Sequence, residues 1–135
     1  MKLHHIGKVV GNIEEAVSYH RETFGLEPIG EKVIDPIQKV EVISLNAGFG
    51  NDVTIELIHP ITEDSPVNKF LKSGGGLHHL SFRVSDLQGT IDEMREKGAL
   101  VLGKIVPSAG HDNIPSVWLY TRSKELIELM EIKES

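Results

Sequence analysis

One sequence pattern occurs twice in this chain, and it constrains the fold more than any other feature. Residues 3–13 read LHHIGKVVGNI, and residues 77–87 read LHHLSFRVSDL. Each copy is followed later in its half by the segment IEL, at residues 55–57 and again at residues 127–129. A repeat of this kind indicates two copies of one folding unit in a single chain.

The order of strand and helix signals is also the same in both halves. Short segments rich in apolar and β-branched residues open the halves at residues 3–10 and 77–84, and each predicts a strand. A helix and three more strands are expected after each of them. The later strands are predicted at residues 28–34, 38–46 and 52–59 in the first half, and at 99–106, 115–121 and 126–132 in the second. The sequence therefore predicts an α+β fold made of two tandem βαβββ modules.

Both expected helices carry matching end signals. A polar residue that can cap the first turn stands three residues before a Glu or Gln, and a glycine follows the last turn. These residues are Asn12, Glu15 and Gly25 in the first half, and Ser85, Gln88 and Gly98 in the second. We expect one domain, with module one at 1–60, a linker at 61–76 and module two at 77–135. In the linker, Ser65-Pro66 and the glycines at 74–76 predict a short helix and a hinge.

Composition narrows the classes of function. The chain has 135 residues and no cysteine, which excludes disulfides and thiolate metal sites. Its formal net charge of −6 is opposite to the broad positive field that nucleic acids and anionic membranes select. No apolar segment approaches the ~18 residues that a membrane span requires. We expect a cytoplasmic protein whose partner is a small molecule, with no nucleic acid and no membrane involved.

The repeated histidines and glutamates are the residues best suited to chemistry. Adjacent side chains in a strand point to opposite faces, so only one histidine of His4-His5 and one of His78-His79 can face a shared interior. If the two modules pack about a pseudo-twofold axis, equivalent histidines and glutamates converge at the centre. Two imidazoles and two carboxylates suit Co, Ni, Zn, Mn or Fe(II) and leave coordination positions open. A solvent-exposed Glu or a structural His is the ordinary alternative at any one of these positions.

These residues together resemble the vicinal oxygen chelate superfamily over essentially the whole chain. Residues 58–71, IHPITEDSPVNKFL, followed by GLHH at 76–79, are similar to methylmalonyl-CoA epimerases within it. The resemblance implies a glyoxalase-like fold whose sheets curve around a central metal site. It implies His5, Glu56, His79 and Glu128 as the ligands of one divalent ion, Co, Ni, Zn or Mn.

The resemblance also implies a reaction and further site residues. A divalent ion next to a thioester carbonyl stabilises the enolate that forms when the adjacent C–H loses its proton. Epimerisation then needs acid/base groups on both faces of the enolate. The resemblance assigns these roles to Glu41 and Glu128, the latter being also a metal ligand. His111, in the segment Gly110-His111-Asp112-Asn113, is a candidate substrate contact, and a polar turn is the alternative interpretation.

Other functions share this ligand pattern or this architecture. Residues 118–125, WLYTRSKE, lack the His-Pro-Lys turn that similar methylmalonyl-CoA epimerases have before the last strand. The ligand set His, Glu, His, Glu is also that of bacterial glyoxalase I (lactoylglutathione lyase). Val9 and Pro60 stand where similar glyoxalases tend to have Arg and Asn for glutathione. A metal-free binding or resistance protein and an Fe(II) dioxygenase are further alternatives. The presence of four potential ligands argues against the metal-free protein, and a carboxylate at Glu56 argues against the dioxygenase. We expect an acyl-CoA or glutathione thioester as substrate and a homodimer as the assembly.

Overall fold

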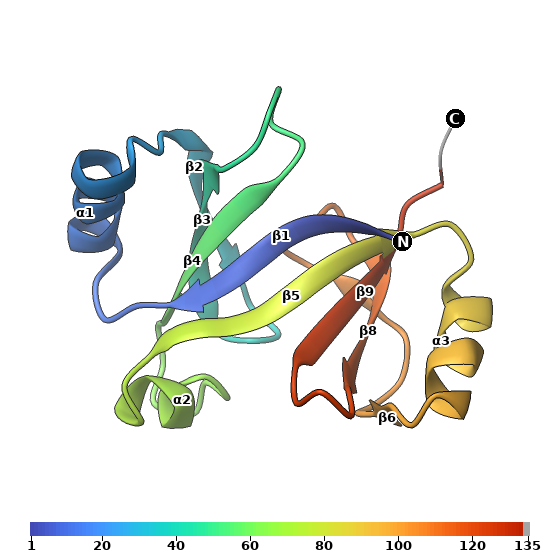
Figure 1. Cartoon of the computed structure of the whole chain (residues 1–135). Helices are drawn as coiled ribbons and strands as arrows, with labels where there is room; N and C mark the ends of the chain where they lie inside the picture. Colours follow the sequence, from blue (N-terminus) through green and yellow to red (C-terminus); the bar gives the residue numbers. More distant parts are fainter. Residues whose placement is uncertain (134–135) are drawn as a thin grey trace. The chain divides into compact units, whose positions relative to one another are not determined.

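The computed structural model describes residues 1–133 of the chain (Figure 1). It contains two compact units. The first unit comprises residues 5–78, and the second comprises residues 1–4 together with the chain from residue 79 onward. The boundaries fall inside the two repeated strands, between the paired histidines, and not at the ends of the modules expected from the sequence. The expected domain bounds therefore stay a prediction.

The first unit has one sheet with a helix packed against each of its faces. Its elements are β1 (Lys2–Val9, whose first residues belong to the second unit), α1 (Ile13–Phe24), β2 (Pro28–Asp35), β3 (Val40–Asn46), β4 (Thr54–Pro60) and α2 (Asn68–Lys72). The strand order is β2-β3-β4-β1, with β1 parallel to β4 and the other neighbours antiparallel. The βαβββ order predicted for the first half is confirmed.

The two faces of this sheet carry different cores. On one face, Leu45 and Leu57 are fully buried and pack with Ile13 of α1. On the other face, Val9, Val40 and Ile58 pack with Val67 and the partly buried side chains of α2. Because residues alternate between faces in a strand, β3 and β4 each contribute to both cores. This alternation determines which polar side chains share a face.

The second unit has the same plan. Its elements are the larger part of β5 (Gly76–Val84), α3 (Leu87–Glu96), β6 (Leu100–Val101), β7 (Val106–Ser108), β8 (Ile114–Tyr120) and β9 (Leu126–Glu131). The strand order is β5-β9-β8-β6, with β7 also paired to β8. Leu87 and Ile91 of α3 pack on Leu119 and Leu129 of the sheet. The α+β fold class predicted from the sequence is confirmed.

Two local predictions for the second half are wrong. The N-cap of α3 is Asp86 and not Ser85: the Asp86 backbone is extended and its carboxylate accepts a hydrogen bond from the Gly89 N–H. The strand expected at 99–106 is broken into β6 and β7. Gly103 adopts a φ of 156° in the break. Ala99 and Val101 pack against the core of the second unit, but the apolar residues at 100, 102 and 105–106 remain exposed, so beyond Val101 no buried face continues the strand.

The end signals of α1 are confirmed. Asn12 caps the helix, because its side chain accepts a hydrogen bond from the Glu15 N–H at 2.9 Å, and Gly25 ends it in the left-handed conformation. The linker contains the expected short helix, α2, which ends before the glycines. Gly75 has a φ of +69°, and a Cβ there would lie 2.9 Å from the Val9 carbonyl oxygen. A close backbone approach therefore requires glycine at this position.

Candidate metal centre

His5 and Glu56 form a buried pair in the first unit. Gly7 of β1 lies opposite Glu56 of β4, and His5 is two residues from Gly7, so both side chains project from the same face. The His5 Nδ1 and the Glu56 Oε2 are 2.9 Å apart. The residues are 1% and 3% exposed. This burial rules out the interpretation of Glu56 as a solvent-facing strand residue.

His79 and Glu128 form the corresponding pair in the second unit. Ser81 of β5 lies opposite Glu128 of β9, and His79 is two residues before Ser81 on the same face. His79 is 8% exposed and Glu128 is 5% exposed. Each residue can offer a ligand atom within 4.8 Å of the other. The repeat in the sequence thus produces the same buried imidazole and carboxylate arrangement twice.

Trp118 supports the second pair, and sequence reasoning gave it no role. It lies opposite Glu128 in the β8–β9 ladder and contacts the His79 ring edge to face, with 4.8 Å between the ring centroids. Such a contact restricts the orientation of the imidazole. Side chains alternate between the two faces along each strand, so the sequence could have placed Trp118 beside Glu128 only if the register between β8 and β9 were known.

The chemistry of these two pairs fits a divalent metal ion. Imidazole nitrogen and carboxylate oxygen are the ligands of choice for borderline divalent ions. A carboxylate buried to this degree is costly unless it is paired, hydrogen-bonded or bound to a metal. Neither pair alone provides a full ligand set, because structural and catalytic sites of this kind use at least three protein ligands.

The first histidine of each sequence doublet, His4 or His78, is not part of a buried His–Glu pair and has different neighbours. His4 is half-buried, and its ring lies 5.5 Å from that of His111 in an edge-to-face arrangement. His78 is half-buried and contacts Phe70 edge to face at 4.8 Å. Burial lowers the pKa of His78 below its ordinary value because the charged imidazolium is poorly solvated there. In each doublet the second histidine, His5 or His79, is therefore more deeply buried than the first.

His111 lies in the turn between β7 and β8. Its Nδ1 is 3.0 Å from the Ser108 Oγ, and its backbone N–H donates to the Ser108 carbonyl. Asp112 and Asn113, which follow it, both have positive φ values, as short polar side chains in turns often do. The structure places His111 beside His4, and its role toward a substrate stays a prediction.

Glu41 lies on the opposite face of its sheet from Glu56. In the uninterrupted β3–β4 register, Ser44 is the residue opposite Glu56, whereas Glu41 is opposite His59. Glu41 therefore shares its face with Leu45 and Leu57, which pack against α1. This arrangement does not bring Glu41 to the His5–Glu56 pair.

The partners of Glu41 are basic. Its carboxylate is 3.4 Å from the His59 Nδ1 and 3.6 Å from the Lys32 Nζ, and Lys32 also binds Glu14 of α1 at 2.8 Å. The Glu14 and Glu41 carboxylates raise the pKa of Lys32, and the Lys32 ammonium lowers the pKa of Glu14. Glu41 thus takes part in a charged network between α1 and the sheet.

Two polar residues on the face of His79 and Glu128 were missed from the sequence. Ser81 is fully buried, and its Oγ has no hydrogen-bond partner among the described residues. Arg83, opposite Met130, follows on the same face, and its buried Nε also has no hydrogen-bond partner there. The signal was available in the sequence, since residues 79, 81 and 83 of one strand share a face.

Comparison with protein families identifies the kind of protein. The model of the Glyoxalase/Bleomycin resistance protein/Dioxygenase superfamily matches residues 4–115. The chain belongs to this superfamily. The family expected from the repeated His and Glu motifs is confirmed.

Individual relatives narrow the comparison. The chain is 33% identical to the ethylmalonyl-CoA/methylmalonyl-CoA epimerase of Cereibacter sphaeroides, over 97% of this chain and 98% of that protein. The crystal structure of methylmalonyl-CoA epimerase from Mycobacterium tuberculosis superimposes with a TM-score of 0.81 at 26% identity, covering 96% of this chain and 86% of that one. A Streptomyces coelicolor methylmalonyl-CoA epimerase variant in complex with 2-nitronate-propionyl-CoA has a TM-score of 0.79 at 28% identity, covering 96% and 95%.

The described residues also bear on membrane insertion. No helix among residues 1–133 has the length and apolar composition needed to span a membrane.

Proposed function

We propose that this protein is a metal-dependent epimerase that acts on methylmalonyl-CoA or a closely related acyl-CoA. The main support for the proposal is that each unit contains its own buried imidazole and buried carboxylate. The 33% identity to an ethylmalonyl-CoA/methylmalonyl-CoA epimerase, which extends over nearly the full length of both chains, supports the choice of substrate.

The four buried residues His5, Glu56, His79 and Glu128 would hold one divalent ion, Co, Ni, Zn or Mn. Two observations support this ligand set, and each holds for both pairs: the residues are buried, and each pair combines one imidazole with one carboxylate. A bound divalent ion would supply positive charge beside the thioester carbonyl and so make the adjacent C–H more acidic.

The residues of the chain would move the proton. Glu128 is buried in an apolar strand, where a carboxylate can exchange a proton with a carbon acid without competition from water. The second acid/base group is proposed to be Glu41, as the resemblance implies, although its position on the α1 face of the sheet favours the other buried carboxylate, Glu56, as the alternative. His111 is proposed as a substrate contact.

A proton-exchange assay in deuterated water tests the function. Metal-loaded protein should introduce deuterium at the α-carbon of methylmalonyl-CoA, and protein treated with a chelator should not. A parallel reaction with the hemithioacetal of methylglyoxal and glutathione tests the glyoxalase I alternative. Thioester formation there, with methylmalonyl-CoA left unlabelled, would replace the proposed function. No activity in either reaction by metal-replete protein would refute both.

The assembly and location remain parts of the proposal. We expect a homodimer, to be checked by light scattering of the purified protein, and a cytoplasmic enzyme whose partner is its small thioester substrate. These expectations follow from the resemblance and the composition.

A further inference from the structure

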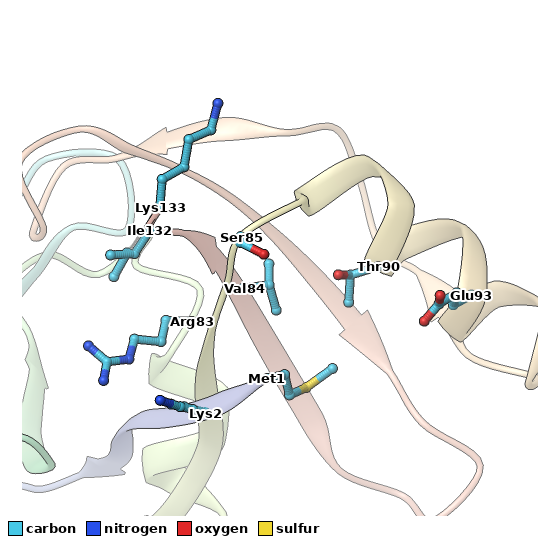
Figure 2. Close-up of a pocket in the computed structure, with 9 residues that line it drawn as sticks. All are labelled: Met1, Lys2, Arg83, Val84, Ser85, Thr90, Glu93, Ile132 and Lys133. Carbon is cyan, nitrogen blue, oxygen red and sulfur yellow. The ribbon is translucent and has the colours of Figure 1, made fainter. Parts of the chain in front are cut away.

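The second unit contains a cavity of about 630 Å³ that the metal ligands do not line (Figure 2). It lies where β5 and β9 end and α3 begins. Its polar lining consists of Lys2, Arg83, Ser85, Thr90, Glu93 and Lys133. In Figure 2 the nitrogen-bearing ends of Lys2 and Arg83 extend toward the same side, whereas Thr90 and Glu93 project from α3.

The charge of this cavity is opposite to that of the chain. The protein carries a formal net charge of −6, yet three cationic residues and one acidic residue, Glu93, line the cavity. Concentrating cations in a concave site raises the local potential for an anion more than the same charges would on a flat surface. The cavity therefore favours an anionic ligand.

Arg83 is the residue that points most directly to a ligand. Its side chain is half-buried, and its Nε is buried without a hydrogen-bond partner among residues 1–133. A buried guanidinium N–H group that lacks an acceptor is unfavourable, and phosphate oxygens match the fork of guanidinium donors. An anion in the cavity would supply the missing acceptor.

Two backbone N–H groups at the start of α3 already have acceptors from the protein. The Leu87 N–H donates to the Glu131 carboxylate at 2.9 Å, and the Gly89 N–H donates to the Asp86 carboxylate at 3.1 Å. The Asp86 and Glu131 carboxylates thus already accept hydrogen bonds from the backbone of α3. Recognition of an anion here would depend on the cationic side chains.

We propose that this cavity binds a phosphate group, with Arg83 as its principal ligand and Lys2 and Lys133 adding charge. Resting on the proposed function, the phosphate is one of those in the CoA part of the substrate. Arg83 follows His79 by four residues on the same strand face, a separation of ~13 Å. The long pantetheine arm that separates the thioester from the phosphates of CoA is compatible with this separation.

Direct binding tests the site without relying on catalysis. Calorimetric titration of the wild-type protein with CoA and with inorganic pyrophosphate should show binding of both, whereas pantetheine, which has no phosphate, should bind more weakly than CoA. Arg83→Gln should weaken CoA and pyrophosphate binding roughly 10- to 100-fold, because a charge-assisted hydrogen bond is lost. Glu93→Gln should strengthen both by about two-fold. Lys97→Gln, an equal change of charge at an exposed position outside the cavity, should have no effect.

Kinetics distinguish this inference from the proposed function. With methylmalonyl-CoA, Arg83→Gln should raise KM and leave kcat close to its wild-type value. With the methylmalonyl thioester of pantetheine, the variant and the wild type should have equal KM values. If the protein exchanges no proton but Arg83→Gln still weakens CoA binding, the proposed function fails and the phosphate site remains.

Three results would overturn or redirect the inference. Equal CoA and pyrophosphate binding by the wild type and Arg83→Gln would refute the site, as would the absence of any phosphate binding by correctly folded wild-type protein. Weakened pyrophosphate binding with unchanged CoA binding would assign the cavity to a free phosphate ligand and would refute the link to the substrate. A circular dichroism spectrum and an unfolding curve for each variant would show that it is folded.

Discussion

The carboxyl groups of Glu41, Glu56 and Glu128 differ in burial and in the sheet face from which they project. Glu56 and Glu128 are 3% and 5% exposed, whereas the Glu41 side chain is 21% exposed and contacts Lys32 and His59. We expect Glu128→Gln to lower the rate of deuterium exchange about 100-fold or more, because a general acid/base group is lost. Glu41→Gln should also lower the rate, because Glu41 is the proposed second acid/base group; a rate close to that of the wild type would instead favour Glu56 in this role.

Loss of exchange in Glu41→Gln with unchanged metal content would support Glu41 as the second base, although Glu41 lies on the α1 face of its sheet. Glu56→Gln provides the matched comparison, because the amide retains an oxygen that can bind a metal but cannot accept the proton. Metal retained with exchange lost in Glu56→Gln would identify Glu56 as the second acid/base group.

Trp118 is expected to act through His79. Its edge-to-face contact holds the imidazole ring, and groups that orient a metal ligand typically contribute 10- to 100-fold to affinity. Trp118→Ala should therefore weaken metal binding by about 10-fold, as measured by competition with a chromophoric chelator. Trp118→Phe, which keeps an aromatic ring, should lose less. Equal affinities in the wild type and Trp118→Ala would show that the contact does not position His79.

At the scale of elements, the connection from α2 to β5 depends on Gly75. Its φ of +69° disfavours any other residue, and a Cβ there would lie 2.9 Å from the Val9 carbonyl oxygen. Gly25 has the same φ of +69°, but a Cβ at that position would meet nothing within 4 Å. In urea unfolding, Gly25→Ala should cost about 1–2 kcal/mol and Gly75→Ala distinctly more. Equal costs would show that the backbone approach to Val9 relaxes freely.

The turn between β8 and β9 is held by Glu125. Its carboxylate accepts hydrogen bonds from Ser123 and Thr121, at 2.5 and 2.6 Å, and these bonds lower its pKa below the ordinary value. A carboxyl whose pKa is lower in the folded state stabilises the protein above the unfolded pKa of ~4.3, and this contribution is lost as the pH falls through the folded pKa.

Thr121→Val should therefore lower the free energy of unfolding more at pH 7 than at pH 3. Urea unfolding of both proteins at the two pH values measures this difference. The control is the same substitution in a Glu125→Gln background, where the effect of Thr121→Val should no longer change with pH. A pH-independent effect in the wild-type background would contradict the assignment of the lowered pKa to these hydrogen bonds.

At the scale of the whole molecule, the proposal requires both units to serve one ion. Metal analysis of the loaded wild-type protein should then give one divalent ion per chain. His5→Ala and His79→Ala, each in a different unit, should both bind the ion more weakly than the wild type, because each variant lacks one of the four proposed ligands. His59→Gln, a half-buried histidine outside both pairs, should retain the ion. Full metal content in either alanine variant would contradict a shared site.

Much of the fold and of the candidate site was predictable from the sequence because the signals are local. The βαβββ order follows from hydrophobic period and from helix ends such as Asn12 and Gly25, which depend on a few neighbouring residues. The repeat identified both His–Glu pairs, and alternation limited the buried histidine to one of each doublet. Local signals were weaker at residues 99–106, where the structure has two short strands in place of the one predicted. They were also weaker at Ser85, because the adjacent Asp86 can cap α3 equally well and does so in the structure.

Only the tertiary structure decided which side chains share a face across neighbouring strands. The sequence alternates reliably within β3 and within β4, but the register between them determines that Glu41 lies opposite His59 and away from Glu56. In the same way, the pairing of β5 with β9 places Glu128 on the face of His79 and Arg83, and the ends of β5, β9 and α3 close the cavity around Arg83. A shift of one residue in register would reverse each of these relations without altering any local propensity, because the side-chain period of a strand is two.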